Sequence, residues 1–394
     1  MLSKLVENIT PSATQEMEIT VADLEAAGVD IIGLNAGEPD MGTPQFIADA
    51  CKKALDDGKT KYVNTAGIPE LRKAICEKLK RDNGLDYEPS QICVSTGAKL
   101  ALNNAVKAVV DPGTEVIIPS PCWVSYEEIV KLVGATPVTV PTLENFQLDV
   151  EAIRNAITNK TSAIILNTPN NPTGAVYSEE SLRKVAELAV QYDFYVIADE
   201  IYEKLIYADQ KHVSIAGFSK EAYEHTIVIN GFSKAYCMTG WRIGYTAAPK
   251  DIAPGIADLQ GHMTSSTTTF VQYAAVEALQ NGEEAVREMS REFERRKNYI
   301  YNRLIQIDGI TCSNVEGAFY LMPDVSSYYG KSAMGTVIHN SFDFGNYILK
   351  EARVAILPGE AFHAPNCMRI AYTNSMENLK EAMDRMEAAL AKIN

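Results

Sequence analysis

Between residues 92 and 247 the sequence repeats one pattern, in which a short apolar run is followed by a stretch with apolar residues at helical spacing. Short apolar strands that are separated by helices are typical of parallel sheets buried on both faces. We therefore expect an α/β domain from about residue 45 to 280, with crossover helices on both sides of its sheet. The expected strands are 92–94, 115–119, 138–140, 163–167, 194–199, 227–230 and 243–247, and the clearest helices are 99–110 and 178–192.

The pattern changes near residue 283. Residues 283–305 form one long, charged helical pattern, and a mixed region follows with expected strands near 317–322 and 368–372. A further helix is expected from Met376 to the C-terminal end. This part of the chain predicts a second, smaller α+β domain.

The charge and the cysteines narrow the possible classes. The 36 basic and 51 acidic residues give a net charge of −15, so the chain has no general attraction for nucleic acid or anionic lipid. The seven cysteines are scattered and odd in number, which predicts free thiols in a reducing compartment. The first residues are too polar for a signal peptide, and no apolar run is long enough to span a membrane. We expect a cytoplasmic protein that contacts neither membrane nor nucleic acid.

Several catalytic motifs are absent from the sequence. It contains no G-x-G-x-x-G fingerprint, phosphate-binding loop of the G-x-x-x-x-G-K-[ST] type, G-x-S-x-G elbow or H-E-x-x-H motif. The five histidines show no metal-ligand spacing. Polar residues instead follow several expected strands, and ligands of open α/β sheets bind at the carboxyl ends of the strands.

Two charged residues lie at such strand ends. Lys234 follows the strand 227–230 and precedes Arg242, and partial burial beside a second cation favours the neutral amine that Schiff-base chemistry requires. A surface lysine in a turn between two strands is the alternative. Asp199 ends an apolar run, so its carboxylate is expected at the rim of the sheet, where it meets a cation or caps a helix.

Two loops add polar groups to the same edge. The run N-T-P-N-N-P-T-G at 167–174 predicts a rigid turn that displays side-chain amides. The run S-T-G-A-K at 95–99 opens a helix, where free N–H groups and a glycine make an anion site. Either loop is also compatible with an ordinary turn. Together, these features indicate a phosphate-bearing ligand near a lysine.

The order of these runs, continued by A-D-E-I-Y, S-K-A-Y-C-M-T-G-W-R-I-G-Y and R-I-A-Y, resembles the class I pyridoxal-phosphate aminotransferases of fold type I, in particular the bacterial aspartate aminotransferase branch. The resemblance implies pyridoxal 5'-phosphate as the cofactor and a homodimer with shared active sites. It also implies a large domain with a mostly parallel seven-stranded sheet and a small α+β domain formed by both chain ends. Residues 1–44 would join the small domain, 45–283 would form the large domain and 284–394 the C-terminal small domain.

The resemblance also assigns roles toward the cofactor. Lys234 would bind it covalently and then move the proton, Asp199 would pair with the ring nitrogen, and Tyr202 would contact the phenolate oxygen. The remaining cofactor-binding residues would be Gly97, Ala98, Lys99, Trp123, Asn171, Ser233, Arg242 and, from the partner subunit, Tyr62. A core aromatic is the alternative for Trp123.

Substrate binding is assigned in the same way. Arg369 and Gly37 would hold the α-carboxylate, with Trp123 and Asn171 beside them. Lys99 would bind a distal carboxylate, assisted by Ser12 and Thr14, although an exposed charge at a helix start is equally compatible with its position.

These assignments predict ping-pong transamination between aspartate or glutamate and 2-oxoglutarate. The alternatives are an aromatic amino-acid aminotransferase, which would differ only in pocket lining, and a pyridoxal-phosphate β-lyase for cystathionine-like substrates. A non-catalytic, cofactor-binding regulator is a further alternative, but no basic helix-turn-helix segment precedes residue 30.

Overall fold

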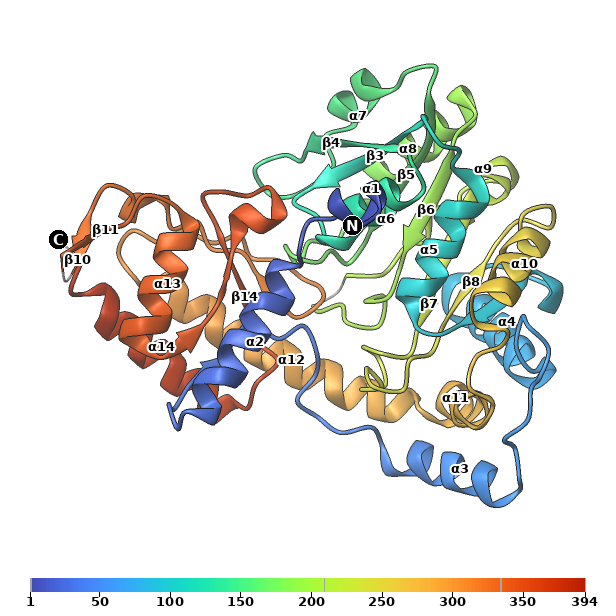
Figure 1. Cartoon of the computed structure of the whole chain (residues 1–394), viewed down its shortest axis with the longest axis horizontal. Coiled ribbons are helices and arrows are strands. Elements are labelled where there is room, and N and C mark those ends of the chain that lie inside the picture. The colour runs from blue at the N-terminus through green and yellow to red at the C-terminus, as the bar shows by residue number, and fades with distance from the viewer. Residues whose placement is uncertain (1, 209, 334, 394) are drawn as a thin grey trace.

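The computed structural model describes residues 2–208, 210–333 and 335–393. A larger body is built around one long sheet, and a smaller body is built around the C-terminal helices (Figure 1). The chain end marked C lies in the smaller body, whereas helix α1 (Lys4–Glu7) lies over the larger one.

The larger body contains a seven-stranded sheet with the order β2-β8-β7-β6-β5-β3-β4. Strand β8 is antiparallel to both of its neighbours, and the other neighbouring strands are parallel. The predicted, mostly parallel seven-stranded sheet is therefore confirmed, and each strand lies within two residues of its expected ends. The strands are β2 (Ile92–Ser95), β3 (Glu115–Ser120), β4 (Thr136–Pro141), β5 (Thr161–Asn167), β6 (Tyr195–Asp199), β7 (Thr226–Gly231) and β8 (Gly244–Ala247).

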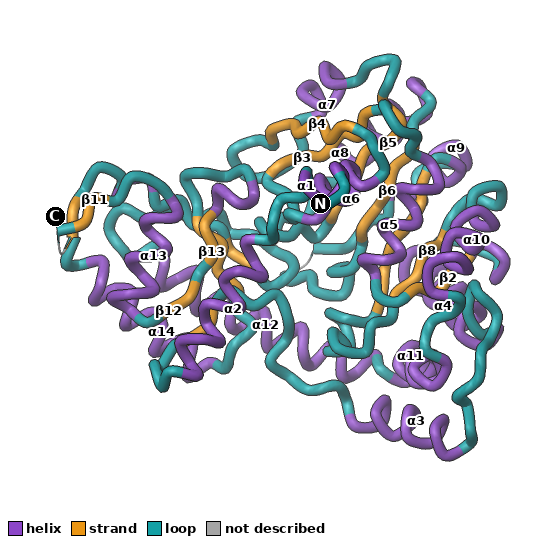
Figure 2. The backbone as a smooth tube through the Cα atoms, viewed as in Figure 1, coloured by secondary structure: helices purple, strands orange, loops and turns teal. Residues whose placement is uncertain are grey.

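Alternate residues of the central strands pack into two different hydrophobic clusters. On β5, Ile165 belongs to the cluster that includes residues of α5 (Ala98–Val109) and α6 (Ser125–Leu132). Ile164 and Leu166 belong to the cluster that includes residues of α8 (Glu179–Tyr192). Side chains alternate between the faces of a strand, so both faces of the sheet are buried. Figure 2 shows the strands lying between helices. The wholly apolar runs in the sequence are explained by this double burial.

The helices of the larger body begin and end at recognisable residues. The Ser178 hydroxyl accepts a hydrogen bond from the Ser181 N–H at the start of α8, and Gly84 ends α4 with a φ of 69°. The helices are α3 (Gln45–Asp56), α4 (Pro69–Asn83), α5 (Ala98–Val109), α6 (Ser125–Leu132), α7 (Val150–Ala156), α8 (Glu179–Tyr192), α9 (Lys220–Glu224), α10 (Ala253–Thr264) and α11 (Thr269–Asn281).

The smaller body combines both ends of the chain. Strand β1 (Ile32–Gly33) pairs in parallel with β12 (Val354–Ala355), and Ile32 is buried in one cluster with residues of the C-terminal helices. The predicted smaller α+β unit is confirmed. Its other strands are β9 (Tyr320–Leu321), β10 (Ser332–Ala333), β11 (Thr336–Val337), β13 (Leu357–Pro358) and β14 (Met368–Ala371), and its other helices are α2 (Ala13–Ala26), α13 (Ser341–Ala352) and α14 (Met376–Leu390).

Helix α12 (Glu283–Leu304) joins the two bodies, as Figure 1 shows. Val286 packs in a cluster of the larger body, whereas Phe293 and Ile300 pack in the cluster of the smaller one. The long charged helix that the sequence predicts is confirmed, and it spans both hydrophobic cores.

Candidate active site

A cavity of about 430 Å³ lies where β5, β6 and β7 end. The larger body, the N-terminal segment and the smaller body all contribute to its lining. The sequence-predicted residues that line it are Thr14, Gly37, Ala98, Lys99, Trp123, Asn171, Asp199, Tyr202, Ser233, Lys234, Arg242 and Arg369. The other lining residues are Glu18, Ala36, Glu38, Tyr126, Asn167, Ile201, Thr239 and Tyr320.

Lys234 lies just beyond the end of β7 and faces this cavity. Its ammonium group donates a hydrogen bond to the Gly37 carbonyl. Burial lowers the pKa of Lys234 to about 8, and Arg369 and Arg242 act in the same direction. About a tenth of the Lys234 side chains are therefore neutral, nucleophilic amines at pH 7, far more than for a lysine with the usual pKa.

Asp199 is the last residue of β6 and is buried, with 4% of its surface exposed. Its Oδ2 atom accepts a hydrogen bond of 2.8 Å from the Tyr126 hydroxyl, and Oδ1 accepts one from the Ile201 N–H. Burial raises the pKa of Asp199 to about 6, although the Tyr126 hydrogen bond lowers it. Within the described part of the chain, no cation forms an ion pair with this carboxylate, so it offers its charge to a ligand in the cavity.

Tyr126 was not predicted from the sequence. It lies on α6, three residues after Trp123, so both aromatic side chains reach one side of the cavity, with ring centroids 5.4 Å apart. That spacing of two aromatic residues is the sequence signal that could have identified it.

An anion-binding cradle lies at the start of α5. Gly97 has a φ of 81°, and a Cβ atom there would lie 2.6 Å from Arg242 Nη2, so only glycine fits this position without displacing the guanidinium group. The Arg242 Nη1 atom donates to the Thr239 carbonyl at 2.8 Å, and Ser233 is buried beside it. Free N–H groups at a helix start, an arginine and a hydroxyl are a donor set that suits a phosphate group.

Arg369 enters the cavity from β14 and is 2% exposed. Its Nη1 atom donates to Asn171 Oδ1 at 3.1 Å and its Nη2 atom to the Asn35 carbonyl at 2.7 Å. The Nε atom has no hydrogen-bond partner among the described residues, and no described carboxylate forms an ion pair with Arg369. A buried guanidinium group with a free N–H is suited to a substrate carboxylate.

Tyr202 and Tyr320 meet on the side of the smaller body, with their hydroxyl oxygens 3.0 Å apart. Tyr320 also lies close to Gly37, where a Cβ atom would be 2.8 Å from the Tyr320 hydroxyl oxygen. The sequence did not identify Tyr320 as a site residue, because the strand that carries it was expected only in the second domain. The contact between the Tyr202 and Tyr320 hydroxyl groups shows that the larger and the smaller body meet at the cavity.

The predicted substrate-specificity residues lie at the rim. The Lys99 side chain is exposed, and its ammonium nitrogen lies 4.7 Å from the centroid of the Trp123 ring. Thr14 lines the cavity and its hydroxyl lies 2.7 Å from that of Ser12, which does not line it. Tyr62 is 90% exposed and takes no part in the cavity of its own chain.

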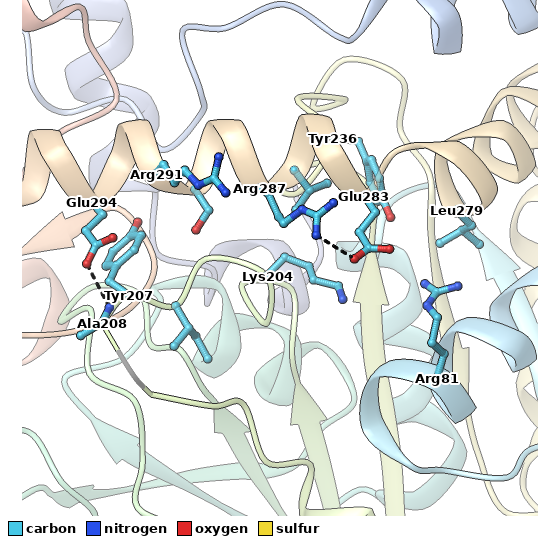
Figure 3. Close-up of a pocket in the computed structure, with 13 residues that line it drawn as sticks. Arg81, Lys204, Tyr207, Ala208, Tyr236, Leu279, Glu283, Arg287, Arg291 and Glu294 are labelled. Carbon is cyan, nitrogen blue, oxygen red and sulfur yellow. Dashed lines mark hydrogen bonds and ion pairs between the residues drawn. The ribbon is translucent and has the colours of Figure 1, made fainter.

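A second cavity, of about 340 Å³, lies against α12 and away from the predicted residues (Figure 3). Three of its cations are already paired, because Arg81 and Lys204 both contact Asp82 and Arg287 contacts Glu283. Local charge is thus largely balanced there, and the first cavity remains the candidate active site.

Comparison with known proteins assigns the family. A model described as aminotransferase class I and II matches residues 29–386. The chain belongs to this family. An aminotransferase of this family uses pyridoxal phosphate to move an amino group between an amino acid and a 2-oxo acid, so the predicted enzyme class and cofactor are confirmed.

The relatives of this aminotransferase support the same assignment. The aspartate aminotransferase of Geobacillus stearothermophilus is 46% identical over 387 residues, which cover 98% of each chain. The crystal structure of the aspartate aminotransferase from Rhizobium meliloti matches with a TM-score of 0.97, at 38% identity and over 100% of both chains. The aromatic aminotransferase from Pyrococcus horikoshii OT3 matches with a TM-score of 0.87 at 42% identity, covering 94% of this chain and 98% of that one.

The cavity fits pyridoxal phosphate. It combines a carboxylate that no described cation pairs with, an amine with a lowered pKa and a cradle for an anion, which are three groups that the cofactor requires. Within the described residues, no helix is both long enough and apolar enough to cross a membrane.

Proposed function

We propose that this aminotransferase acts on aspartate or glutamate as amino donor and on 2-oxoglutarate as acceptor. The observation that carries the proposal is that two cations besides Lys234 and Arg242 line the cavity, Arg369 deep inside and Lys99 at the rim. A dicarboxylate needs one cation for each end, and the aspartate aminotransferases named above are relatives along nearly the whole chain.

The cofactor, when bound, supplies an aldehyde that holds the amino group and an electron-poor ring that withdraws electrons from the α-carbon. In our proposal Asp199 pairs with the ring nitrogen, because it is the buried carboxylate of the cavity that no described cation neutralises. Tyr126 supports this role, since its hydrogen bond favours the ionised carboxylate. Tyr202 and Asn171 would contact the phenolate oxygen, and Trp123 would cover the ring face.

The cradle at the start of α5 would hold the cofactor phosphate through Gly97, Ala98, Ser233 and Arg242. Lys99, at the same helix start, would lie between this phosphate and the substrate. The phosphate would fix the position of the ring, so that binding energy far from the reacting atoms is used for orientation.

Arg369 would bind the substrate α-carboxylate through its free Nε atom and one Nη atom. Asn171 holds the guanidinium plane by accepting from Nη1, and Gly37 leaves room beside Tyr320 for the carboxylate. This arrangement fixes the α-carbon relative to the amine of Lys234.

Lys234 would move the proton. In its neutral form it would accept the proton of the substrate α-carbon and then donate it to the former aldehyde carbon of the cofactor, C4′, acting as a general base and afterwards as a general acid. Amino donor and oxo-acid acceptor both require Arg369, so they would use one site in turn, which gives ping-pong kinetics.

We also propose a homodimer, in which the exposed Tyr62 side chain reaches the phosphate of the partner subunit. In each subunit, residues 1–44 and 284–394 would form the small domain and residues 45–283 the large domain. Helix α12 would couple the two, because its ends lie in different cores.

An aromatic amino-acid substrate is the second candidate, favoured by the 42% identity to an aromatic aminotransferase. A β-lyase would use the same Lys234 and Asp199. The test incubates the purified enzyme with pyridoxal phosphate, 2-oxoglutarate and either aspartate or phenylalanine. We expect glutamate to form faster with aspartate, and a preference for phenylalanine would contradict the proposal. A third incubation replaces the donor with cystathionine; release of pyruvate and ammonia without formation of glutamate would also contradict it.

A further inference from the structure

The segment from Asp199 to Glu203 carries functional and buried polar groups side by side. Asp199 and Tyr202 line the candidate active site. Glu200 and Glu203 do not line it and are nevertheless buried, with 1% and 8% of their surfaces exposed. Two buried glutamates next to two site residues require an explanation, because an uncompensated buried carboxylate is strongly unfavourable.

Glu200 is compensated by a buried histidine and a serine. Its Oε2 atom lies 3.0 Å from His212 Nε2, and its Oε1 atom accepts a hydrogen bond of 2.5 Å from the Ser214 hydroxyl. The His212 side chain is 8% exposed, and its Nδ1 atom has no hydrogen-bond partner among the described residues. The backbone N–H of Glu200 donates to the Ile229 carbonyl on β7. The residue after Asp199 is thus fixed through both its backbone and its side chain.

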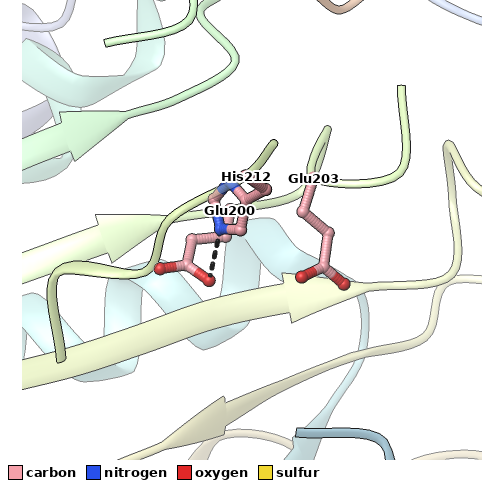
Figure 4. Close-up of side chains that lie close together, drawn as sticks. All are labelled: Glu200, Glu203 and His212. Carbon is pink, nitrogen blue, oxygen red and sulfur yellow. Dashed lines mark ion pairs between the residues drawn. The ribbon is translucent and has the colours of Figure 1, made fainter. Parts of the chain in front are cut away.

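Glu203 is compensated by Lys78, whose ammonium group forms an ion pair with it, and by a hydrogen bond of 2.8 Å from Asn83 Nδ2. The ligand atoms of Glu200, Glu203 and His212 all lie within 4.8 Å of one another, and Figure 4 shows the three side chains together. A metal ion is not required here, because Lys78 already supplies a cation to Glu203.

The positive charge that faces the Glu200 carboxylate is supplied by His212. Burial lowers the pKa of His212, but the nearby Glu200 and Glu203 carboxylates outweigh it, so the pKa is raised above its usual value. Burial likewise raises the pKa of Glu203, whereas Lys78 and His212 lower it to about 2. Protonated His212 and Lys78 together neutralise the two glutamates.

The charge of Glu200 also affects the candidate active site, because Glu200 directly follows Asp199 in the chain. Besides burial, the charge of Glu200 raises the pKa of Asp199, while Tyr126 and Lys234 lower it. His212 opposes the effect of Glu200, because its positive charge lies directly beside that carboxylate. A histidine that does not line the cavity thus faces the glutamate that directly follows Asp199.

We propose that His212 and Glu200 are positioning residues: together they fix the Asp199–Glu203 segment, and His212 offsets the charge of Glu200 so that Asp199 stays ionised for its role toward the cofactor. This inference rests on the proposed role of Asp199. The pair acts through Asp199 and touches neither substrate nor cofactor.

The experiment measures the affinity of the cofactor-free protein for pyridoxal phosphate by calorimetry, across the pH range in which Asp199 titrates. In His212→Gln the charge of Glu200 is uncompensated, so Asp199 should lose its proton only at higher pH. In this variant, we expect the pH at which the affinity falls on acidification to be about one unit higher than in the parent protein. Between these two pH values, the variant should bind pyridoxal phosphate about tenfold more weakly. In Glu200→Gln the fall should move to lower pH, and in the double variant it should return close to that of the parent.

The control is His225→Gln. His225 pairs with Asp193 at 3.2 Å, ahead of the other end of β6, and should leave the profile unchanged. Thermal unfolding of each cofactor-free variant separates stability from positioning. If His212→Gln and Glu200→Gln weaken binding equally, without opposite pH shifts, the pair is only structural and the inference is wrong. If the parent protein itself does not bind pyridoxal phosphate, the proposed function fails instead.

Discussion

The Tyr126 hydroxyl donates a hydrogen bond of 2.8 Å to Asp199 Oδ2 at the carboxyl end of β6. The donor lies on α6 and the acceptor on the sheet, so the contact joins two elements whose packing the sequence does not reveal. It favours the ionised form of a carboxylate that burial would otherwise protonate.

Tyr126→Phe removes this hydrogen bond without changing the shape of the ring. Hydrogen bonds to charged groups contribute about 1.5–3 kcal/mol, so the pKa of Asp199 should rise further above its present value of about 6. We expect cofactor affinity to fall at least about tenfold near pH 6 and clearly less at about pH 9, where Asp199 is largely ionised in both proteins. Calorimetric titration at both pH values checks this; an equal loss at both would contradict it.

Gly97→Ala should damage the phosphate cradle selectively. The new Cβ atom would lie 2.6 Å from Arg242 Nη2, and the backbone of residue 97 has a φ of 81°. We expect affinity for pyridoxal phosphate to fall by roughly 2 kcal/mol or more, with a smaller effect on pyridoxal, which has no phosphate group.

The matched control for this variant is Gly113→Ala. Gly113 has a φ of 84°, but a Cβ atom there would meet nothing within 4 Å. It therefore reproduces the backbone strain of about 1 kcal/mol without the clash. If both variants bind the cofactor equally well, or if pyridoxal binding falls as much as pyridoxal-phosphate binding, Gly97 has no role in the cradle.

Lys99→Ala tests the distal-carboxylate role. The loss of a charged hydrogen bond of about 1.5–3 kcal/mol should raise the Michaelis constant for aspartate more than about tenfold and leave that for phenylalanine nearly unchanged. Steady-state kinetics with both donors provides the measurement. Lys107→Ala, on the same helix α5 but not lining the cavity, serves as the control. Equal changes for both donors would remove Lys99 from substrate selection.

Glu18→Gln tests an unexpected charge at the cavity mouth. Glu18 lines the cavity. Partial burial at the cavity wall and the nearby Arg242 lower the pKa of Lys99, whereas the Glu18 carboxylate raises it. The exposed carboxylate should repel the second carboxylate of aspartate by about 0.2–1 kcal/mol. We expect the Michaelis constant for aspartate to fall about twofold at low salt and the difference to vanish at high salt. An increased constant would show that Glu18 assists binding instead.

The sequence predicts the sheet and the residues at its edge well, because apolar runs define the strands and polar residues such as Lys234 and Asp199 directly follow them. It does not predict contacts between distant elements. Tyr126 and Tyr320 reach the cavity through the packing of α6 and of the smaller body. The expected strand 317–322 is reduced to Tyr320–Leu321, since Ala318 has a φ of 55° that no strand allows.

Three of the residues predicted from the sequence do not line the cavity of this chain, namely Ser12, Gly97 and Tyr62. Tyr62 is exposed and does not line the cavity of its own subunit, so its proposed contact depends on the homodimer. A single chain contains no signal for which exposed surface a second copy covers.

The central claim is that the amine of Lys234 holds pyridoxal phosphate covalently in the resting enzyme. Reduction of the cofactor-loaded protein with borohydride, followed by proteolysis and mass spectrometry, measures this directly. We expect a single phosphopyridoxyl group on the peptide that contains Lys234, and none after the same treatment of Lys234→Ala. An unmodified Lys234 in fully loaded protein, or a stable label on another lysine, would contradict the account.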